Sequence, residues 1–360
     1  FKTGILGNPL NPTPFFDSLC RKGIFFDRFF VPMENTSRSM FCTIASIPDV
    51  SAVENATRNP LILEQDSALR ALDAYDKSFN LGGSANWAQI RGILKRNFPG
   101  IQIFEEGAFR APVVDVWGVS DADLLLETHE RLAAKKGPFW AYIQTSGNHP
   151  PFTIPPHLKD FSPRTLDEGT LKAGAFTGNA EFNAVRLMDY SLEKFFEAAE
   201  KAPYFRNTVF VLWADHGLPR GSTDKRYGDL ALAVHHIPFL IYAPGFIHQG
   251  ERVHTMGAQM DLMPTVMSFL GHETRTRTLG KDLLDPAWAD KSMAFTFTTF
   301  RRPPAYGILR GDWYLTRESD GRRALYRLDD PEGRDIAALE PARVTELERL
   351  AVGFHEWAKY

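Results

Sequence analysis

Apolar runs alternate with amphipathic stretches through the first 285 residues. Runs rich in β-branched and aromatic residues predict strands at 24–31, 139–144, 209–213 and 237–242. Apolar residues that recur every three or four positions predict helices, most clearly over 181–200. The other predicted helices are 14–20, 36–47, 66–78, about 88–97, 121–136 and 259–270, the last with a break or kink at Pro264. The stretches 153–178 and 218–234 lack periodicity and are predicted to be loops.

The pattern changes after Pro286. Short apolar runs are separated by Gly-Asp and Asp-Gly turns, which predicts a small antiparallel sheet, and a helix is expected at about 341–358. The earlier alternation of strands and helices predicts an α/β core whose largely parallel sheet is covered on both faces. We therefore expect a core over residues 1–290 and a small C-terminal subdomain over 291–360. The runs of the predicted C-terminal sheet are 293–300, 307–310, 313–317 and 324–328.

Composition limits the possible classes of protein. The 360 residues are 44% hydrophobic and 24% charged, which is typical of a globular protein, and the net charge of -3 gives no electrostatic case for a nucleic-acid partner. No apolar stretch approaches the ~20 residues of a membrane span. Cys20 and Cys42 are the only cysteines and are predicted to be buried thiols. Because Phe1 follows no initiator Met and no entry strand, we expect a domain of a longer protein.

Asp215 and His216 follow the apolar run 209–213, which we expect to be a strand buried on both faces. Ligand sites in α/β sheets gather at the carboxyl ends of strands. A carboxylate beside an imidazole at such an end is therefore a candidate metal pair. The alternative is an Asp-His pair in an ordinary turn.

Thr36 lies at a predicted helix N-terminus that follows a strand. Free backbone N–H groups and the helix dipole at such a position favour an anion such as phosphate. A threonine hydroxyl is a poor nucleophile unless its pKa is lowered, which metal coordination does. The alternative is that Thr36 only caps the helix.

Histidines supply two further candidates. His149 lies in a polar turn after the strand 139–144, where it could hydrogen-bond a leaving oxygen or act as a general acid. The alternative is an exposed loop histidine. Since neighbouring side chains of an extended chain point apart, at most one of His235 and His236 faces a site, and we favour His236.

Three motifs together resemble a known family. Thr36-Ser37, the turn 146–150 and Asp215-His216-Gly217, in this order, resemble the sulfatase branch of the alkaline phosphatase superfamily. More closely, they resemble the lipoteichoic acid synthase and phosphoglycerol transferase group. The resemblance extends over essentially the whole chain and implies an alkaline-phosphatase-like mixed, mostly parallel sheet. The supporting stretches are 117–121, 237–245, 260–265 and 325–331.

The resemblance implies a chemistry. Thr36 would be the nucleophile and would carry a covalent phosphothreonine intermediate. Thr36, Asp215 and His216 would bind a divalent metal, with Mn favoured over Zn and Mg. His149 would contact the substrate phosphate or assist the leaving group. The predicted substrate-binding residues are His149, His236, Trp87, Arg91 and Asn148.

The resemblance also implies partners and a location. The donor would be an anionic phospholipid headgroup like that of phosphatidylglycerol, and the acceptor a glycan or a glycerol-phosphate chain. The domain would lie outside the cytoplasmic membrane, periplasmic or on its outer face. An N-terminal membrane anchor missing from this sequence would tether it.

Departures from the family pattern leave alternatives open. The acidic first metal ligand of the family would lie before Phe1, so this chain is one carboxylate short. Ala88 and Gln89 follow Trp87 where the synthases carry an Arg, and Arg91 is the nearby replacement. The sequence after Thr36 does not fit the C-x-P-x-R pattern of sulfatases, which argues against sulfate esters. A phosphatase- or sulfatase-type ester hydrolase, or a non-catalytic domain that binds lipid or a partner, are the alternative functions.

Overall fold

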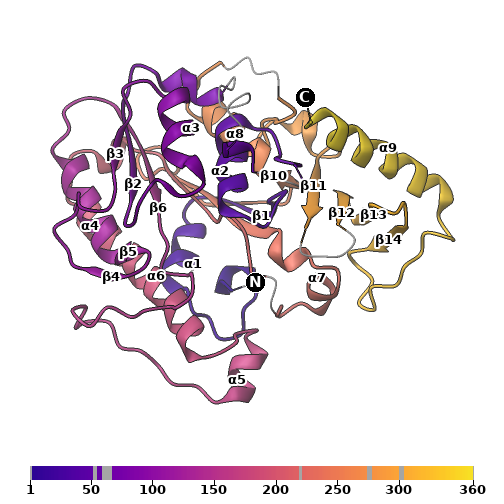
Figure 1. Ribbon diagram of the computed structural model, residues 1–360, viewed down its shortest axis with the longest axis horizontal. Coiled ribbons are helices and arrows are strands. Elements are labelled where there is room, and N and C mark those ends of the chain that lie inside the picture. Colours follow the sequence, from indigo (N-terminus) through magenta and orange to yellow (C-terminus); the bar gives the residue numbers. More distant parts are fainter. Residues whose placement is uncertain are drawn as a thin grey trace. The chain divides into compact units, whose positions relative to one another are not determined.

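The computed structural model describes residues 2–51, 55–58, 67–218, 221–273, 278–299 and 304–359 (Figure 1). The chain forms two compact units, each built from separated stretches. The first unit comprises Phe1–Phe25, Leu72–Val211 and Leu240–Glu251. The second unit comprises Phe26–Ala71, Leu212–Phe239 and Arg252–Tyr360.

The first unit contains a three-stranded parallel sheet in the order β3-β2-β6. Parallel neighbours need crossover connections, and helices supply them. Of these helices, α6 packs against both α4 and α1. The strands are β2 (Asp76–Leu81), β3 (Gln102–Phe104) and β6 (Phe139–Gln144), and the helices are α1 (Pro14–Cys20), α3 (Ile90–Asn97), α4 (Asp121–Ala133), α5 (Glu168–Ala173) and α6 (Asn179–Ala199).

The long helix α6 confirms the prediction from apolar spacing. Its inward stripe includes the buried Phe182, Leu187, Phe195 and Phe196. A two-stranded antiparallel hairpin, β4 (Val113–Asp115) and β5 (Gly118–Val119), precedes α4. The hairpin and the start of α4 together bring several polar side chains to the chain segment that follows β6.

Two of the predicted elements are wrong. Most of the helix expected over 66–78 is instead a short 3-10 turn, Ala68–Leu72, followed by β2; residue 66 lies outside the described residues. The strand was hidden because it buries polar side chains, and Asn80 donates to Ser78 Oγ at 3.1 Å within it. The loop expected over 153–178 contains α5, whose N-cap Asp167 accepts from the backbone N–H of Thr170.

The C-terminal part of the second unit is a four-stranded antiparallel sheet covered by one helix, as predicted. The strands follow the order β11-β12-β13-β14, and α9 packs on β12 and β13 (Figure 1). Inward-facing apolar residues of the sheet meet α9 around Leu347. The elements are β11 (Met293–Thr298), β12 (Ala305–Arg310), β13 (Trp313–Glu318), β14 (Arg323–Arg327) and α9 (Pro341–Trp357).

A further sheet has the strand order β10-β1-β8-β7, and β9 also pairs with β1. The division between the two units falls within β1, β7, β8 and β9. Each residue of β7 is partly exposed, so the expectation of a strand buried on both faces is wrong; β7 stands last in the strand order. The strands are β1 (Ile24–Phe30), β7 (Phe210–Trp213), β8 (His236–Tyr242), β9 (Glu251–Val253) and β10 (Gly257–Ala258).

Three helices complete the second unit: α2 (Thr36–Ala45), α7 (Lys225–Asp229) and α8 (Leu262–Phe269). The region 218–234 is therefore not all loop, although residues 219–220 lie outside the described part. A 3-10 turn over Gln259–Asp261 precedes α8. Pro264 then lies in the first turn of α8, where its missing N–H removes no intrahelical hydrogen bond.

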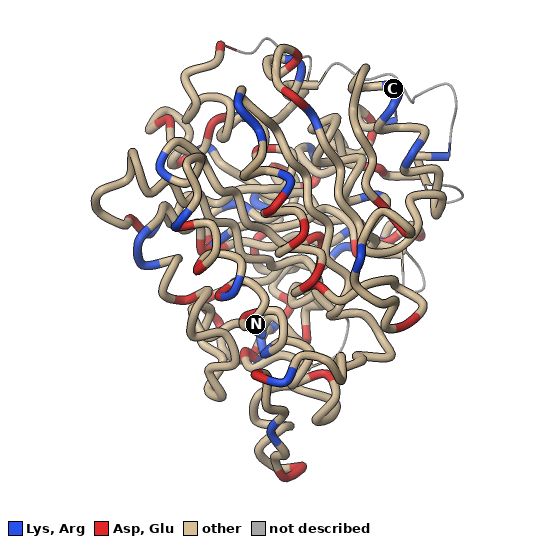
Figure 2. The backbone as a smooth tube through the Cα atoms, turned by 90° about the vertical axis from the view of Figure 1, so that its left-hand side faces the viewer, with Lys and Arg blue, Asp and Glu red and all other residues tan. Residues whose placement is uncertain are grey.

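The α/β fold with a mixed sheet and a C-terminal antiparallel sheet is confirmed, whereas the domain boundary near residue 290 stays a prediction. Cys20 and Cys42 are buried. Acidic and basic residues are interspersed along the described chain in Figure 2. Among the described helices, none combines the length and apolar character needed to cross a bilayer.

Candidate functional site

Thr36 is the first residue of α2, and Asn35 caps that helix. The Asn35 side chain accepts from the backbone N–H groups of Ser37 at 3.1 Å and Arg38 at 3.3 Å. The alternative that Thr36 is the cap is therefore wrong, and its hydroxyl is available for another partner. The same bonds occupy two of the N–H groups that we expected to be open to an anion.

The Thr36 hydroxyl faces His216. Thr36 Oγ1 lies 3.4 Å from His216 Nε2, and His216 Nδ1 lies 2.7 Å from the carbonyl oxygen of Gly217. A carbonyl oxygen can only accept, so Nδ1 carries a hydrogen. In the neutral imidazole, Nε2 then presents its lone pair toward the threonine hydroxyl.

Asp215 completes this cluster. Its Oδ2 lies 3.4 Å from His216 Nε2, while its Oδ1 accepts from the backbone N–H of His216 at 2.9 Å. A carboxylate oxygen and an imidazole lone pair at this separation repel unless a proton or a cation lies between them. We call Thr36, Asp215 and His216 the Thr36 cluster.

The donor set of the Thr36 cluster fits a divalent metal ion. Carboxylate, imidazole and hydroxyl donors suit Mn or Zn better than Mg because of the imidazole. The Asp215 side chain is 41% exposed and that of His216 is 21% exposed, so the donors are open to solvent. Within the described ranges, no group of three or more His, Cys, Asp or Glu residues could hold a metal by itself. The hydroxyl of Thr36 is the third polar group of the cluster, 3.4 Å from His216 Nε2.

His236 is buried in the second unit. Its Nε2 donates to the Asp27 carbonyl at 2.7 Å, and its ring packs 5.0 Å from the ring of Phe30 and 5.3 Å from that of Tyr227. Burial lowers the pKa of His236 to about 3, so the ring is neutral. The neighbouring His235 is also buried and contacts Val31 O and Thr298 Oγ1. The substrate-binding role of His236 stays a prediction.

His149 lies in the first unit, in the turn after β6. Its Nδ1 lies 3.1 Å from the carbonyl oxygen of Pro150, so Nδ1 carries a hydrogen. Its ring lies 3.9 Å from the indole of Trp117, whose Nε1 donates to the same Pro150 oxygen at 2.8 Å. The ring is exposed, and Nε2 is the atom left for a substrate oxygen. Asn148 is also exposed in this turn.

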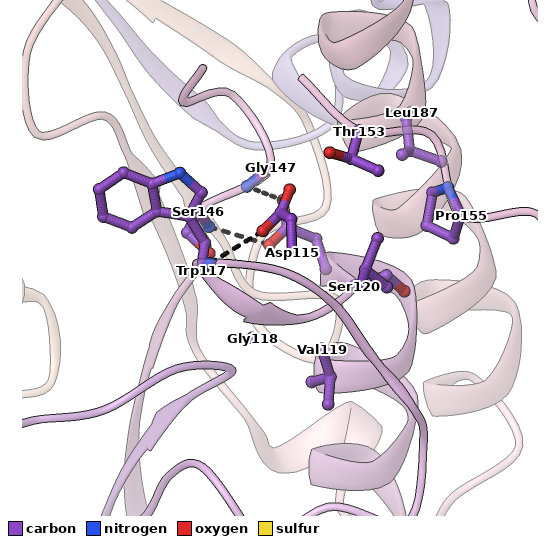
Figure 3. A pocket seen from close by; sticks show the side chains of 12 residues that line it. Asp115, Trp117, Gly118, Val119, Ser120, Ser146, Gly147, Thr153, Pro155 and Leu187 are labelled. Atoms are coloured by element: carbon purple, nitrogen blue, oxygen red, sulfur yellow. Dashed lines mark hydrogen bonds between the residues drawn. The ribbon is translucent and has the colours of Figure 1, made fainter. Parts of the chain in front are cut away.

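A buried carboxylate holds the start of the His149 turn. Asp121 accepts from the backbone N–H groups of Ser146 and Gly147, each at 2.9 Å. Burial raises the pKa of Asp121 to about 6, against the lowering effect of these two hydrogen bonds. Asp121 lines a cavity of about 20 Å³, which has room for one water molecule. Figure 3 shows this cavity, with Trp117, Ser146 and Gly147 on one side and Thr153, Pro155 and Leu187 on the other.

The other two predicted substrate-binding residues are in the first unit. Arg91 pairs with Glu105 and donates through Nε to Asn86 at 3.0 Å, so its guanidinium is already engaged. Partial burial opposes it, but the hydrogen bond from Arg91 lowers the pKa of Glu105. Trp87 begins a 3-10 turn in which Ala88 and Gln89 have φ of 47° and 62°, a left-handed conformation that costs free energy for residues other than glycine. The binding roles of Trp87 and Arg91 stay predictions.

The sequence interpretation missed the contacts of Trp117 and Asp121. The sequence predicted only that a helix begins at Asp121, and Ser120 caps this helix, α4, by accepting from the backbone N–H of Asp123 at 3.2 Å. The sequence did hold a clue, because Ser120 caps the helix and the neighbouring Asp121 carboxylate is then available for another partner. What it touches depends on tertiary structure, which spacing does not reveal.

The chain is similar to known proteins over most of its length. A lipoteichoic acid synthase-like protein, YvgJ of Bacillus subtilis (strain 168), is 26% identical over 290 residues, which cover 76% of this chain and 46% of that protein. The chain spans about half the length of the curated relatives it matches first.

Two solved structures show the same fold. A protein in the alkaline phosphatase superfamily from Vibrio parahaemolyticus has a TM-score of 0.77 at 23% identity, covering 99% of this chain and 84% of that chain. The lipoteichoic acid synthase LtaP from Listeria monocytogenes has a TM-score of 0.74 at 18% identity, covering 97% and 86%. The family model described as Sulfatase matches residues 2–272. This chain belongs to the sulfatase family.

Proposed function

We propose that this chain is the catalytic domain of a metal-dependent phosphoglycerol transferase with Thr36 as its nucleophile. One observation carries the proposal: Thr36 Oγ1 faces the Nε2 lone pair of His216, while Asn35 relieves Thr36 of capping its helix. Relatives named as lipoteichoic acid synthases support the transferase class. Because the chain covers about half of those relatives, its donor, acceptor and location are part of the proposal.

Thr36, Asp215 and His216 would hold the metal ion, and Mn is the ion we favour. When bound, it would lower the pKa of the threonine hydroxyl and neutralise charge on the phosphoryl group. Backbone contacts orient both side chains. Asp215 Oδ1 accepts from the backbone N–H of His216, and His216 Nδ1 donates to the Gly217 carbonyl.

The reaction would proceed by two displacements at phosphorus. Thr36 would react as the alkoxide, its hydroxyl proton having passed to solvent, and it would be released as the alkoxide at the end of the cycle. Its Oγ forms a bond to the phosphorus of a phosphatidylglycerol-like donor, and the bond from phosphorus to the lipid glycerol oxygen breaks. For this step His149 carries hydrogens on both ring nitrogens, and it gives the Nε2 proton to that leaving oxygen while Nδ1–H stays on the Pro150 carbonyl. A hydroxyl of a glycan or glycerol-phosphate acceptor then attacks phosphorus and the bond to Thr36 breaks, while His149 takes up the acceptor proton.

The proposed lipid donor also implies a location. We infer a catalytic domain outside the cytoplasmic membrane, held there by an N-terminal anchor and acting on anionic lipid headgroups. Substrate contacts by His236, Trp87, Arg91 and Asn148 belong to this proposal. To bind a phosphate, the Arg91 guanidinium would first have to exchange its ion pair with Glu105 for the new anion.

The test is to detect the covalent intermediate. The domain is incubated with Mn²⁺ and phosphatidylglycerol without acceptor, then digested, and the peptide containing Thr36 is examined for a phosphoglycerol adduct by mass spectrometry. Thr36→Ala should abolish the adduct, whereas Thr43→Ala, a change of the same size in the same helix, should keep it. Turnover by the Thr36→Ala variant at the normal rate would refute the mechanism.

Ester hydrolysis is the second candidate because the Thr36 cluster is open to solvent, with Asp215 41% exposed. Water could then replace the acceptor in the second displacement. Quantifying free glycerol phosphate against elongated acceptor, with both lipid and acceptor present, separates the two activities. A domain that binds no Mn²⁺ and forms neither product would instead fit the non-catalytic alternative.

A further inference from the structure

We propose that Asp121 is a positioning residue for His149, and that its carboxylate fixes the turn that presents the imidazole to the substrate. The inference rests on the proposed function, because it assumes that His149 takes part in the reaction. Asp121 itself touches no reacting atom in this scheme.

The contacts of Asp121 carry the proposal. Its side chain is 4% exposed, and its two oxygens accept separately from the N–H groups of Ser146 and Gly147 at 2.9 Å. The backbone N–H of His149 in turn donates to the Ser146 carbonyl at 3.0 Å. The carboxylate therefore holds the residue on which the His149 turn closes, and a shift of Ser146 would move His149.

Gly147 shows how closely the carboxylate approaches the turn. A Cβ added to Gly147 would lie 2.5 Å from Asp121 Oδ2, which is shorter than any ordinary contact. Glycine at this position allows the backbone to reach the carboxylate. The two residues thus form a fitted pair rather than a chance surface contact.

The ring of His149 is held by a separate contact. The Trp117 indole lies 3.9 Å from the imidazole, and Pro150 O accepts from both Trp117 Nε1 and His149 Nδ1. Trp117 packs against the ring and Pro150 O sets the tautomer, while Asp121 holds the backbone of the turn. Together they would direct Nε2 of His149 outward.

Asp121 has no comparable duty in its own helix. Ser120 caps α4, and Ser120 Oγ also donates to Asp123 Oδ2 at 2.5 Å. The cost of burying a carboxylate is considerable unless its hydrogen bonds offset it. The hydrogen bonds that offset this cost for Asp121 are those to the turn that carries His149.

Asp189 offers a matched control. It is 6% exposed, accepts from two consecutive backbone N–H groups, those of Phe15 at 3.0 Å and Phe16 at 2.8 Å, and holds the start of α1. Burial raises the pKa of both Asp121 and Asp189 to about 6. Asp→Asn at either position thus removes the same kind of contact, but only one of them holds the His149 turn.

The experiment measures kcat and KM for transfer from phosphatidylglycerol, with melting temperature as the folding check. Its variants are Asp121→Asn, Asp189→Asn, His149→Ala and the double variant Asp121→Asn/His149→Ala. We expect both Asp→Asn changes to lower the melting temperature similarly. Asp121→Asn should lower kcat by about 100-fold with KM nearly unchanged, as misplacement of a reacting group by ~1 Å does, whereas Asp189→Asn keeps kcat. In the His149→Ala background, Asp121→Asn should cost less than about 2-fold, since the group it positions is gone.

Three outcomes would overturn the inference. If Asp121→Asn lowers kcat equally with and without His149, the residue acts elsewhere. If His149→Ala lowers kcat and Asp121→Asn does not, the positioning role alone is wrong. If His149→Ala leaves kcat unchanged, the role of His149 in the proposed function falls as well. Should Asp121→Asn fail to fold, Gly147→Ala pushes the turn away from an intact carboxylate and should give the same loss of kcat and the same dependence on His149.

Discussion

The Thr36 cluster and the His149 turn use different means to hold a reactive side chain. In the Thr36 cluster, Asp215 and His216 are partly exposed, and their second polar atoms are bound within residues 215–217. In the His149 turn, a buried carboxylate and an indole ring from other elements fix both the backbone and the imidazole. Under the proposed function, the first arrangement would reach its final geometry only with a bound cation, whereas the contacts of the second come from the protein itself.

The largest effect should come from removing the nucleophile. Thr36→Ala should lower kcat for transfer by at least about 10⁴-fold, because no other group replaces the attacking oxygen. Thr36→Ser should retain part of the activity, and Thr43→Ala should retain nearly all of it. Steady-state rates with phosphatidylglycerol, together with the melting temperature of each variant, measure this. A Thr36→Ala variant whose kcat is within tenfold of the parent value would show that Thr36 is not the nucleophile.

Metal dependence should separate the two regions next. Chelation should lower the rate by about 10³-fold, and added Mn²⁺ should restore it, because the Thr36 cluster lacks its final geometry without a cation. Asp215→Asn should weaken Mn²⁺ binding in calorimetry, while Asp121→Asn and His149→Ala should leave that affinity unchanged. Equal weakening by all three variants would show that the regions are not independent.

The buried Asp121 carboxylate should make the free energy of unfolding depend on pH. The pKa of Asp121 is about 6 in the folded protein and 3.8 in the reference state, so the folded state binds the proton more tightly. The free energy of unfolding therefore falls as pH rises from about 4 to about 6, by about 3 kcal/mol for this group, and is constant above.

Denaturant titrations of the parent and of Asp121→Asn at pH 4 and pH 7 test this. The difference between the two pH values should shrink by about 3 kcal/mol in the variant. Asp189→Asn should produce a similar change, since burial also raises its pKa to about 6. A pH dependence identical to that of the parent would show that Asp121 is not the titrating group.

The smallest effect should follow loss of the indole N–H. Trp117→Phe keeps an aromatic face against His149 but removes the donor to Pro150 O, which is worth about 1 kcal/mol. We expect kcat to fall by about 3- to 10-fold, and more for Trp117→Ala, which also removes the ring. Rates for the two variants, measured beside each other, separate the hydrogen bond from the ring contact.

Local patterns predicted the elements whose side chains are apolar and regularly spaced. Strands such as β8 and the long helix α6 follow directly from β-branched runs and helical periodicity. The strand β2 was missed because it carries Ser78 and Asn80, which bond each other inside the protein and look like surface residues in the sequence. Polar residues that hydrogen-bond to one another can be buried, and they then interrupt the apolar pattern from which strands are predicted.

The site was predictable in its residue types but not in its contacts. Thr36, Asp215 and His216 were identified from strand ends and a helix start, and the structure brings their polar atoms together. The tautomer of His216 depends on the carbonyl of Gly217, a backbone atom that every residue carries. The support of His149 by Asp121 joins residues 25 and 26 positions apart, which no local spacing encodes.

Asn35 has a consequence for engineering. Because its side chain closes the N-terminus of α2, the identity of residue 36 matters little to whether that helix forms. If Thr36 is the nucleophile that we propose, its attacking atom can be exchanged, oxygen for sulfur with Thr36→Cys or a primary for a secondary alcohol with Thr36→Ser, while Asn35 still caps α2. The chemistry of the proposed reaction could then be altered separately from the folding of the helix.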